Sequence, residues 1–205
     1  LGGIVSSTVV AVSMGRFARR EPERRVPALQ ASLLASAVMY LRLLVIFAIV
    51  GPAFVRPLWW KLLAMAAVGL VLAATLRPPA GEERRESAAV PQLVNPFEVT
   101  PALLFAVLFV LLSIATLLVR DFFGTAGVVS MAALIGLSDI DPFLLSIVGG
   151  GAEPNAVLLA AVIVSILSNT LVKGIYFSSL ARGERRASLL RYGAWAALHL
   201  PLLAV

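Results

Sequence analysis

The chain has 205 residues, of which 60 % are hydrophobic and only 14 % are charged. Soluble domains carry about 25 % charged residues, so the composition argues against a cytosolic enzyme and, because disorder needs the opposite balance, against a disordered chain. The absence of cysteine excludes disulfides, zinc ribbons, iron–sulfur clusters and cysteine nucleophiles. We therefore expect a membrane-embedded protein.

The net charge of +6 comes largely from two arginine blocks, at residues 16–25 and 182–191. Each block lies between long apolar runs, which favours a topology signal at the membrane surface. The blocks could also bind anionic lipid. The sequence shows no nucleic-acid-binding module, so no nucleic-acid partner is expected.

Apolar segments alternate with short polar breaks and predict an all-α, polytopic membrane bundle of about seven segments. In chain order these are Leu1–Met14, Val26–Val50, Leu58–Leu76, Pro101–Val119, Gly124–Gly151, Pro154–Leu180 and Leu189–Val205. A bilayer crossing needs roughly 20 helical residues. Four segments meet that length, and Gly124–Gly151 meets it only if its helix tolerates two carboxylates and a proline at its centre. The chain begins at Leu1 rather than Met, inside an apolar run, so we expect it to be a fragment of a longer protein.

The most polar stretch, Arg77–Glu98, is predicted to be a connecting loop. It divides the chain into a first helical half, residues 1–86, and a second helical half, residues 87–205. We expect the two halves to form one membrane domain.

Gly124–Gly151 carries two carboxylates and a proline near its centre, in the run Ser138-Asp139-Ile140-Asp141-Pro142. Proline lacks a backbone N–H and disfavours helix at the residue before it. We expect two half-helices around an unwound turn, which survives at membrane depth only when it is buried in protein or lines a wet cavity.

The positive-inside rule separates two topologies for this segment. If it crosses the membrane once, eight loop Lys and Arg residues lie inside and seven outside. If it is re-entrant, twelve lie inside and three outside. The charge count favours the re-entrant topology.

A weak internal repeat complicates that choice. Residues 3–8 align with residues 136–141, and residues 37–42 align with residues 168–173, in the same order along the chain. Duplicated halves are common among transporters, whose sites lie at broken helices in corresponding positions. Parallel repeats would favour a single crossing and conflict with the charge count, so both topologies remain open.

Four motifs resemble a family of bacterial multi-spanning membrane domains of unknown function, often fused behind an MgtC/SapB-type membrane domain. These motifs are residues 1–8, Asn95-Pro96-Phe97-Glu98, residues 136–141 and residues 168–173. The resemblance covers nearly the whole chain. It implies a bacterial inner-membrane protein with a missing N-terminal membrane domain as partner, and an association with magnesium limitation through MgtC. It supplies no mechanism.

Asp139 and Asp141 are the sharpest candidates for a site. Intramembrane carboxylates usually face a cavity or a partner and mark ion or proton paths. On an unwound turn both could reach one cavity. Because only oxygen ligands are on offer, a bound metal would be Mg²⁺ or another hard cation, with these two residues as its ligands. The competing interpretation is a loop mouth where both carboxylates face water.

Two cations lie inside predicted spans. Ser165, Asn169 and Lys173 share one helix face, which either lines a cavity or forms interhelical hydrogen bonds. Arg42 and Lys173 could each extend to the membrane surface or balance the two aspartates. Ser32, Ser36 and Tyr40 form a second stripe, in which the two serines are best explained by helix packing.

The hydroxyl residues Ser6, Ser7 and Thr8 occupy the repeat position of the acidic turn, where they could coordinate an ion, cap a helix or bond to the preceding turn. His199 has no obvious partner and is interpreted as a polar residue at a helix end. The sequence has no P-loop, HExxH or GxSxG pattern and no nucleophile–base pair, so we expect no enzyme.

The expected function is a transporter-like or ion-handling inner-membrane protein with a polar midplane cavity. Its cargo would be a hard divalent cation or a proton coupled to another solute. The alternative is a non-transporting regulator or scaffold that binds another membrane protein, and a homo-oligomer is also conceivable. The residues expected to line the cavity are Asp139, Asp141, Asn169, Lys173, Ser6, Ser7, Thr8 and Arg42.

Overall fold

The computed structural model describes residues 6–76, 99–137 and 139–204. Every regular element in these ranges is helical, in the order α2 (Ser7–Arg20), α3 (Arg25–Val50), α4 (Val55–Ala74), α5 (Val99–Ile135), α6 (Asp141–Gly149), α7 (Ala156–Leu180) and α8 (Arg185–Ala197). The 3₁₀ turns Pro22–Arg24, Pro52–Phe54, Arg182–Glu184 and Leu200–Leu203 join or follow them. The predicted boundary at residues 86–87, the Asn95–Glu98 motif and the segment 1–5 lie outside the described residues.

Three helical stretches are long and apolar enough to cross a membrane: Pro22–Val50, Pro52–Ala74 and Ala156–Leu180. They match the predicted spans at residues 26–50, 58–76 and 154–180 to within a few residues. A shorter apolar helix covers Phe122–Ile135. The predicted last span is instead split into α8 and the 3₁₀ turn at Leu200–Leu203, because Pro201 cannot continue the helix.

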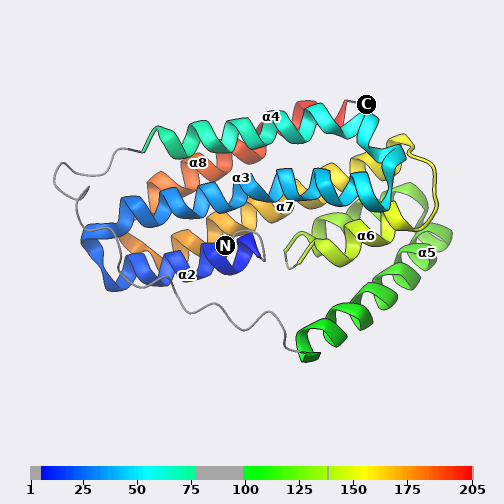
Figure 1. The fold of residues 1–205 in the computed structure, drawn as a ribbon, viewed down its shortest axis with the longest axis horizontal. Coiled ribbons are helices and arrows are strands. Elements are labelled where there is room, and N and C mark those ends of the chain that lie inside the picture. The colour runs from blue at the N-terminus through cyan, green and yellow to red at the C-terminus, as the bar shows by residue number, and fades with distance from the viewer. Residues whose placement is uncertain (1–5, 77–98, 138, 205) are drawn as a thin grey trace.

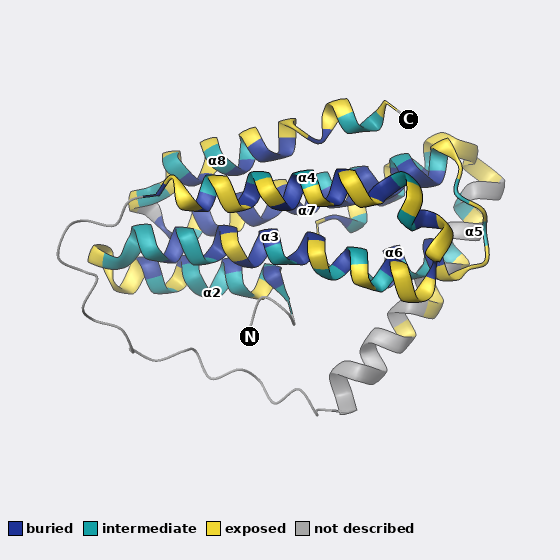
Figure 2. Ribbon diagram, turned by 45° about the horizontal axis from the view of Figure 1, so that its top comes forward, coloured by how far each residue is buried: buried dark blue, intermediate teal, exposed yellow. Residues whose placement is uncertain are grey.

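Long helices α3 and α7 lie side by side in opposite directions at the centre of the bundle (Figure 1). Arg25, where α3 begins, contacts Gly183 just after the end of α7. Midway, the hydroxyls of Tyr40 and Thr170 are 2.9 Å apart. Buried residues recur along both helices and alternate with intermediate and exposed ones (Figure 2).

The segment at residues 124–151 folds as two helical pieces with a break between them. Gly124 has φ 60° and ψ −148°, a conformation open to glycine, and divides α5 into two parts. Helix α5 ends at Ile135 and α6 begins at Asp141. The chain then returns toward the end of the bundle from which it came, so the two pieces form a helical hairpin (Figure 1).

The same order of helices occurs twice along the chain, and corresponding helices run in opposite directions. In each half a short helix leads to a long one, then a 3₁₀ turn and another helix: α2, α3, α4 and α6, α7, α8. Figure 1 shows α2 and α6 both starting near the middle of the bundle and running toward opposite ends. The repeat is therefore inverted, and the conflict between repeat and charge count disappears because it arose only for parallel halves.

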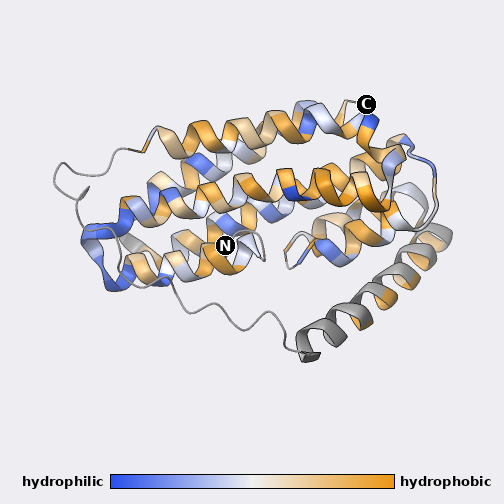
Figure 3. Cartoon of the chain, in the orientation of Figure 1, coloured by the Kyte–Doolittle hydropathy of each residue, from blue (hydrophilic) through white to orange (hydrophobic). Residues whose placement is uncertain are grey.

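Both arginine blocks lie at one end of this bundle. The contact of Arg25 with Gly183 joins the two blocks directly, and this end is the most hydrophilic part of the ribbon in Figure 3. At the other end, Gly51 after α3 meets Val148 of α6. The exposed Trp59 and Trp60 lie near that second end, where an aromatic belt is expected.

Candidate functional site

An ion pair joins the middle of α3 to the first residue of α6. The Nη2 atom of Arg42 donates to Oδ1 of Asp141 at 2.7 Å and to Oδ2 at 2.6 Å. Both side chains are largely buried, with 19 % and 15 % of their areas exposed. The carboxylate also lies at the N-terminus of α6, where the helix dipole favours negative charge.

Asp139 does not join Asp141 in a shared cavity. It is exposed, and its Oδ1 accepts a hydrogen bond from the backbone N–H of Asp141 at 3.1 Å. This bond satisfies one of the N–H groups that a helix start leaves without an intrahelical partner. Asp139 therefore helps to begin α6, and Asp141 faces α3.

Lys173 is fully buried on α7, with none of its surface exposed. Its ammonium donates to the thioether sulfur of Met39, 2.9 Å away. It lies within electrostatic reach of Arg42, Asp141 and Asp139, but within the described residues it has no carboxylate at ion-pair distance. The sequence predicted that Arg42 and Lys173 together balance Asp139 and Asp141. In the structure Arg42 pairs with Asp141, and Lys173 forms no ion pair with either carboxylate among the described residues.

The polar residues of α7 next to Lys173 bind the broken end of α5. The hydroxyl of Ser168 donates to the carbonyl of Ala133 at 2.7 Å, and the amide of Asn169 donates to the carbonyl of Gly136 at 3.2 Å. The first carbonyl belongs to the last turn of α5 and the second to the residue directly after it, where intrahelical partners run out. Asn169 is therefore in interhelical contact, whereas Ser165 bonds within its own helix to Val162.

Ser6 is the N-cap of α2 and accepts a hydrogen bond from the backbone N–H of Val9 at 3.3 Å. Ser7 is buried and Thr8 is half-buried in the first turn. The sequence left ion coordination, helix capping and bonding to the preceding turn open for these hydroxyls, and the structure shows capping for Ser6. Ser6 and Asp139 thus have equivalent positions, each just before the short helix of its half.

The donor set does not suit a hard divalent cation at Asp139 and Asp141. Both carboxylate oxygens of Asp141 are bound to Arg42, and one oxygen of Asp139 holds a backbone N–H. Two cationic side chains and a helix N-terminus surround the position, so a further positive charge would be repelled. Among the described residues no three His, Asp or Glu side chains gather as a metal site would require.

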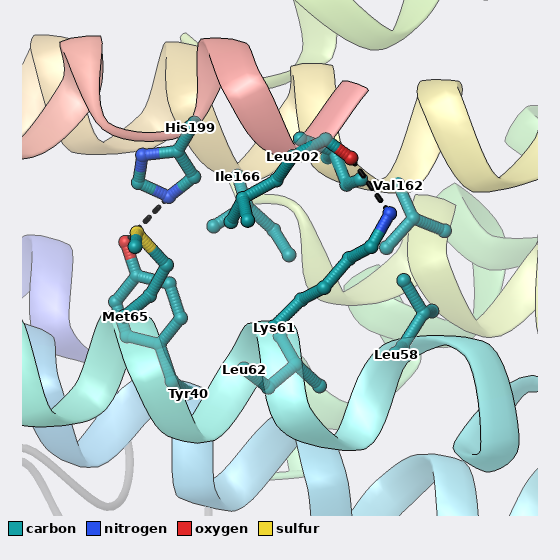
Figure 4. A pocket seen from close by; sticks show the side chains of 10 residues that line it. Tyr40, Leu58, Lys61, Leu62, Met65, Val162, Ile166, His199 and Leu202 are labelled. Carbon is teal, nitrogen blue, oxygen red and sulfur yellow. Dashed lines mark hydrogen bonds between the residues drawn. The ribbon is translucent and has the colours of Figure 1, made fainter. Parts of the chain in front are cut away.

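A second polar group lies toward the other end of the bundle, around His199. This residue is buried, with Nε2 at 3.0 Å from the hydroxyl of Tyr40 (Figure 4). Its Nδ1 lies 2.9 Å from the carbonyl oxygen of Trp195. The interpretation of His199 as a residue without a partner is wrong. His199 follows the end of α8.

The pocket beside His199 is mostly apolar and is closed on one side by Lys61, whose ammonium donates to the carbonyl of Leu202 at 2.7 Å (Figure 4). Its lining comes from α3, α4, α7 and the C-terminal turn: Tyr40, Leu58, Lys61, Leu62, Met65, Val162, Ile163, Ile166, His199 and Leu202. Sequence reasoning missed Lys61 because it follows Trp59 and Trp60, where a surface position is expected.

The stripe Ser32, Ser36 and Tyr40 joins the two halves. Both serine hydroxyls reach the hydroxyl of Tyr192 on α8, at 2.8 and 3.2 Å. This arrangement matches the predicted role in helix packing.

Comparison with known proteins gives a family but no activity. The model of a domain of unknown function, DUF4010, matches residues 1–181. An uncharacterized protein of Aquifex aeolicus (strain VF5) is 25 % identical over 179 residues, covering 86 % of this chain and 77 % of that protein. No solved structure matches the chain. Since the family model covers most of its length, this protein belongs to the DUF4010 family of domains of unknown function.

Proposed function

We propose that this protein is a transporter-like, ion-handling membrane protein whose site lies between the starts of α2 and α6. Two features support this. The halves are inverted relative to each other, and each contributes a short helix that begins near the middle of the bundle (Figure 1). Inverted repeats with discontinuous helices, whose N-termini point at a midplane site, are a common architecture of secondary transporters.

The observation that carries the proposal is the buried charge at this point. Arg42, Asp141 and Lys173 lie together where three helices meet. Charged side chains inside a membrane are costly and usually mark ion, proton or substrate paths. If stability were the only requirement, apolar residues of similar volume would serve as well as a buried ion pair.

The cargo that fits best is a proton coupled to a charged solute. Asp141 is the group that would release Arg42 when protonated, because loss of its negative charge removes the attraction between them. A hard divalent cation such as Mg²⁺ has no suitable donor set at Asp139 and Asp141. We therefore favour proton coupling over magnesium transport.

For the membrane placement, we propose that the long axis of the bundle follows the membrane normal of a bacterial inner membrane. The basic end then faces the cytoplasm, and the hairpin enters and leaves on the opposite side. Together with the short helices this gives about seven membrane-embedded segments, in a domain attached behind an MgtC/SapB-type membrane domain.

The second candidate function is a non-transporting scaffold or regulator. The observation that favours it is the closed geometry of the Arg42–Asp141 pair, in which both carboxylate oxygens are bound to the guanidinium. A pair that never opens would only lock α3 to α6.

The test is a flux measurement on the full-length protein in liposomes, with an internal pH dye and imposed gradients of protons, divalent cations and small anions. We expect solute-driven proton movement that is lost in Asp141→Asn. The control is Glu153→Gln, an exposed residue at the bundle end outside the site. If folded protein moves no proton under any gradient, transport is refuted and the scaffold is favoured.

A further inference from the structure

The two arginine blocks meet at one end of the bundle and form a single basic cluster. Gly15 of α2 contacts Leu180 at the end of α7, so the last turn of α2 lies beside the turn that joins α7 to α8. Arg25, at the start of α3, contacts Gly183 in that turn. Arginines from both halves of the chain are therefore brought together at this end, which is strongly hydrophilic in Figure 3.

Arg25 joins the two blocks and is seated on a glycine. A Cβ added at Gly183 would overlap the guanidinium group and would lie 2.7 Å from its Nε. That Nε is buried and has no hydrogen-bond partner within the described part of the chain. The position of Arg25 thus depends on the absence of a side chain at Gly183, and no carboxylate among the described residues pairs with it.

Most of the surrounding arginines also lack a counter-charge. Within the described residues, the ion pair at this end of the bundle joins Arg24 to Glu21 at 3.3 Å. The arginines that are exposed and form no ion pair with a described residue are Arg16, Arg19, Arg20, Arg185 and Arg186. A planar guanidinium presents paired N–H donors that match phosphate oxygens. The cluster is therefore suited to a negatively charged phosphate group.

Exposed apolar side chains adjoin these arginines on α8. Leu189 and Leu190 are 41 % and 62 % exposed. They lie one helical turn after Arg185 and Arg186, so each follows an arginine on the same face of the helix. A free phosphate ion would use the arginines alone, whereas a phospholipid carries its phosphate next to apolar chains. This combination of side chains favours a lipid headgroup at the membrane surface.

We propose that this basic cluster binds the phosphate group of an anionic phospholipid, with the guanidinium of Arg25 among its donors and Leu189 and Leu190 beside the acyl chains. The seat on Gly183 holds that guanidinium next to the exposed arginines, and the lipid phosphate supplies the counter-charge that no described carboxylate supplies to them. This inference goes beyond the proposed function: it uses the placement of the basic end at the membrane surface and no step of transport.

The test measures lipid binding by the full-length protein in a neutral detergent. Thermal unfolding is followed against rising concentrations of phosphatidylglycerol, with phosphatidylcholine as the neutral lipid and inorganic phosphate as the free anion, at constant ionic strength. We expect a saturable rise of the melting temperature with phosphatidylglycerol alone. An equal rise with phosphatidylcholine would show that no charge is required, and a rise with inorganic phosphate would show that no lipid is required. Either result overturns the proposal.

Gly183→Ala is the most specific variant because it leaves the net charge unchanged. The added methyl group displaces the guanidinium of Arg25 from its seat. We expect the apparent Kd for phosphatidylglycerol to rise about fivefold, which is the effect of losing one arginine at a membrane surface. The matched control is Gly193→Ala, where a Cβ has open space and the Kd should stay unchanged. Because Gly183 is exposed in a 3₁₀ turn, the variant should fold.

A second pair of variants separates this site from a general attraction between arginine and anionic lipid. Arg25→Gln should raise the Kd about fivefold, whereas Arg56→Gln removes an exposed arginine near the opposite end of the bundle and should leave the Kd unchanged. An equal rise in both variants, or an unchanged Kd in Gly183→Ala, would overturn the proposal.

The outcomes are independent of the flux measurement. Phosphatidylglycerol binding that weakens in Gly183→Ala supports the lipid site even if liposomes show no proton flux, in which case transport alone is refuted. Conversely, the absence of any effect of phosphatidylglycerol on the melting temperature overturns the lipid site even if proton flux is observed.

Discussion

Arg42 and Asp141 are 99 residues apart in sequence, yet one guanidinium nitrogen lies within 2.7 Å of both carboxylate oxygens. The contact fixes the start of α6 against the middle of α3. It therefore determines where the hairpin of the second half meets the long helix of the first half. The ion pair gives a direct link between the two halves at the depth where a site is proposed.

Breaking this pair on one side should destabilise the protein strongly. Asp141→Asn leaves the guanidinium buried without its counter-charge, and we expect a loss on the order of 3 kcal/mol. The double variant Arg42→Met/Asp141→Leu removes both charges and should recover most of that loss. Chemical denaturation in detergent measures both values, with Asp139→Asn as the exposed control. A double variant less stable than Asp141→Asn would show that the pair is not the link described.

Ser168 and Ser165 of α7 should contribute differently to stability, because only Ser168 bonds to the broken end of α5. Ser168→Ala leaves the carbonyl of Ala133 without its 2.7 Å partner, which should cost about 1–3 kcal/mol. Ser165→Ala only removes a bond within α7 and should cost less. Melting temperatures of the two variants, measured side by side, check this order. Equal losses would argue against the role of Ser168 in holding the hairpin.

Gly136 allows the close approach of the hairpin to α7. A Cβ added there would lie 2.7 Å from the carbonyl oxygen of Ser165 and would also overlap the side chain of Ser168. We expect Gly136→Ala to cost about 1–3 kcal/mol through overpacking. The control is Gly193→Ala in α8, where a Cβ has open space and should stabilise the helix by up to about 1 kcal/mol. A neutral Gly136→Ala would contradict this packing.

The sequence was sufficient to predict the long helices because their signal is local. Uninterrupted apolar runs bounded by Gly51-Pro52 or by an arginine block give the ends of α3 and α7 to within a few residues. The break before Asp141 follows equally directly from Pro142. These features depend on neighbouring residues alone.

The direction of the repeat could not be predicted from the sequence, because aligned residues carry no orientation. Only the positive-inside count indicated a hairpin, and the contact of Arg25 with Gly183 now places both arginine blocks at one end. The partner of Asp141 was similarly open between Arg42 and Lys173, since both cations lie late in equivalent spans. His199 was missed because its partners, Tyr40 and the carbonyl of Trp195, are brought to it by packing.

The measurement that tests the inverted architecture most directly is site-specific labelling, which the cysteine-free chain makes straightforward. Single cysteines are introduced at exposed positions by Arg20→Cys and Arg185→Cys at the basic end, and by Ala53→Cys and Glu153→Cys at the other end. A membrane-impermeant maleimide is applied to sealed inside-out vesicles and to intact spheroplasts. We predict that the first two react only in inside-out vesicles and the last two only in spheroplasts. Reaction of Arg185→Cys on the side opposite to Arg20→Cys would contradict the account, because residues 124–151 would then cross the membrane once.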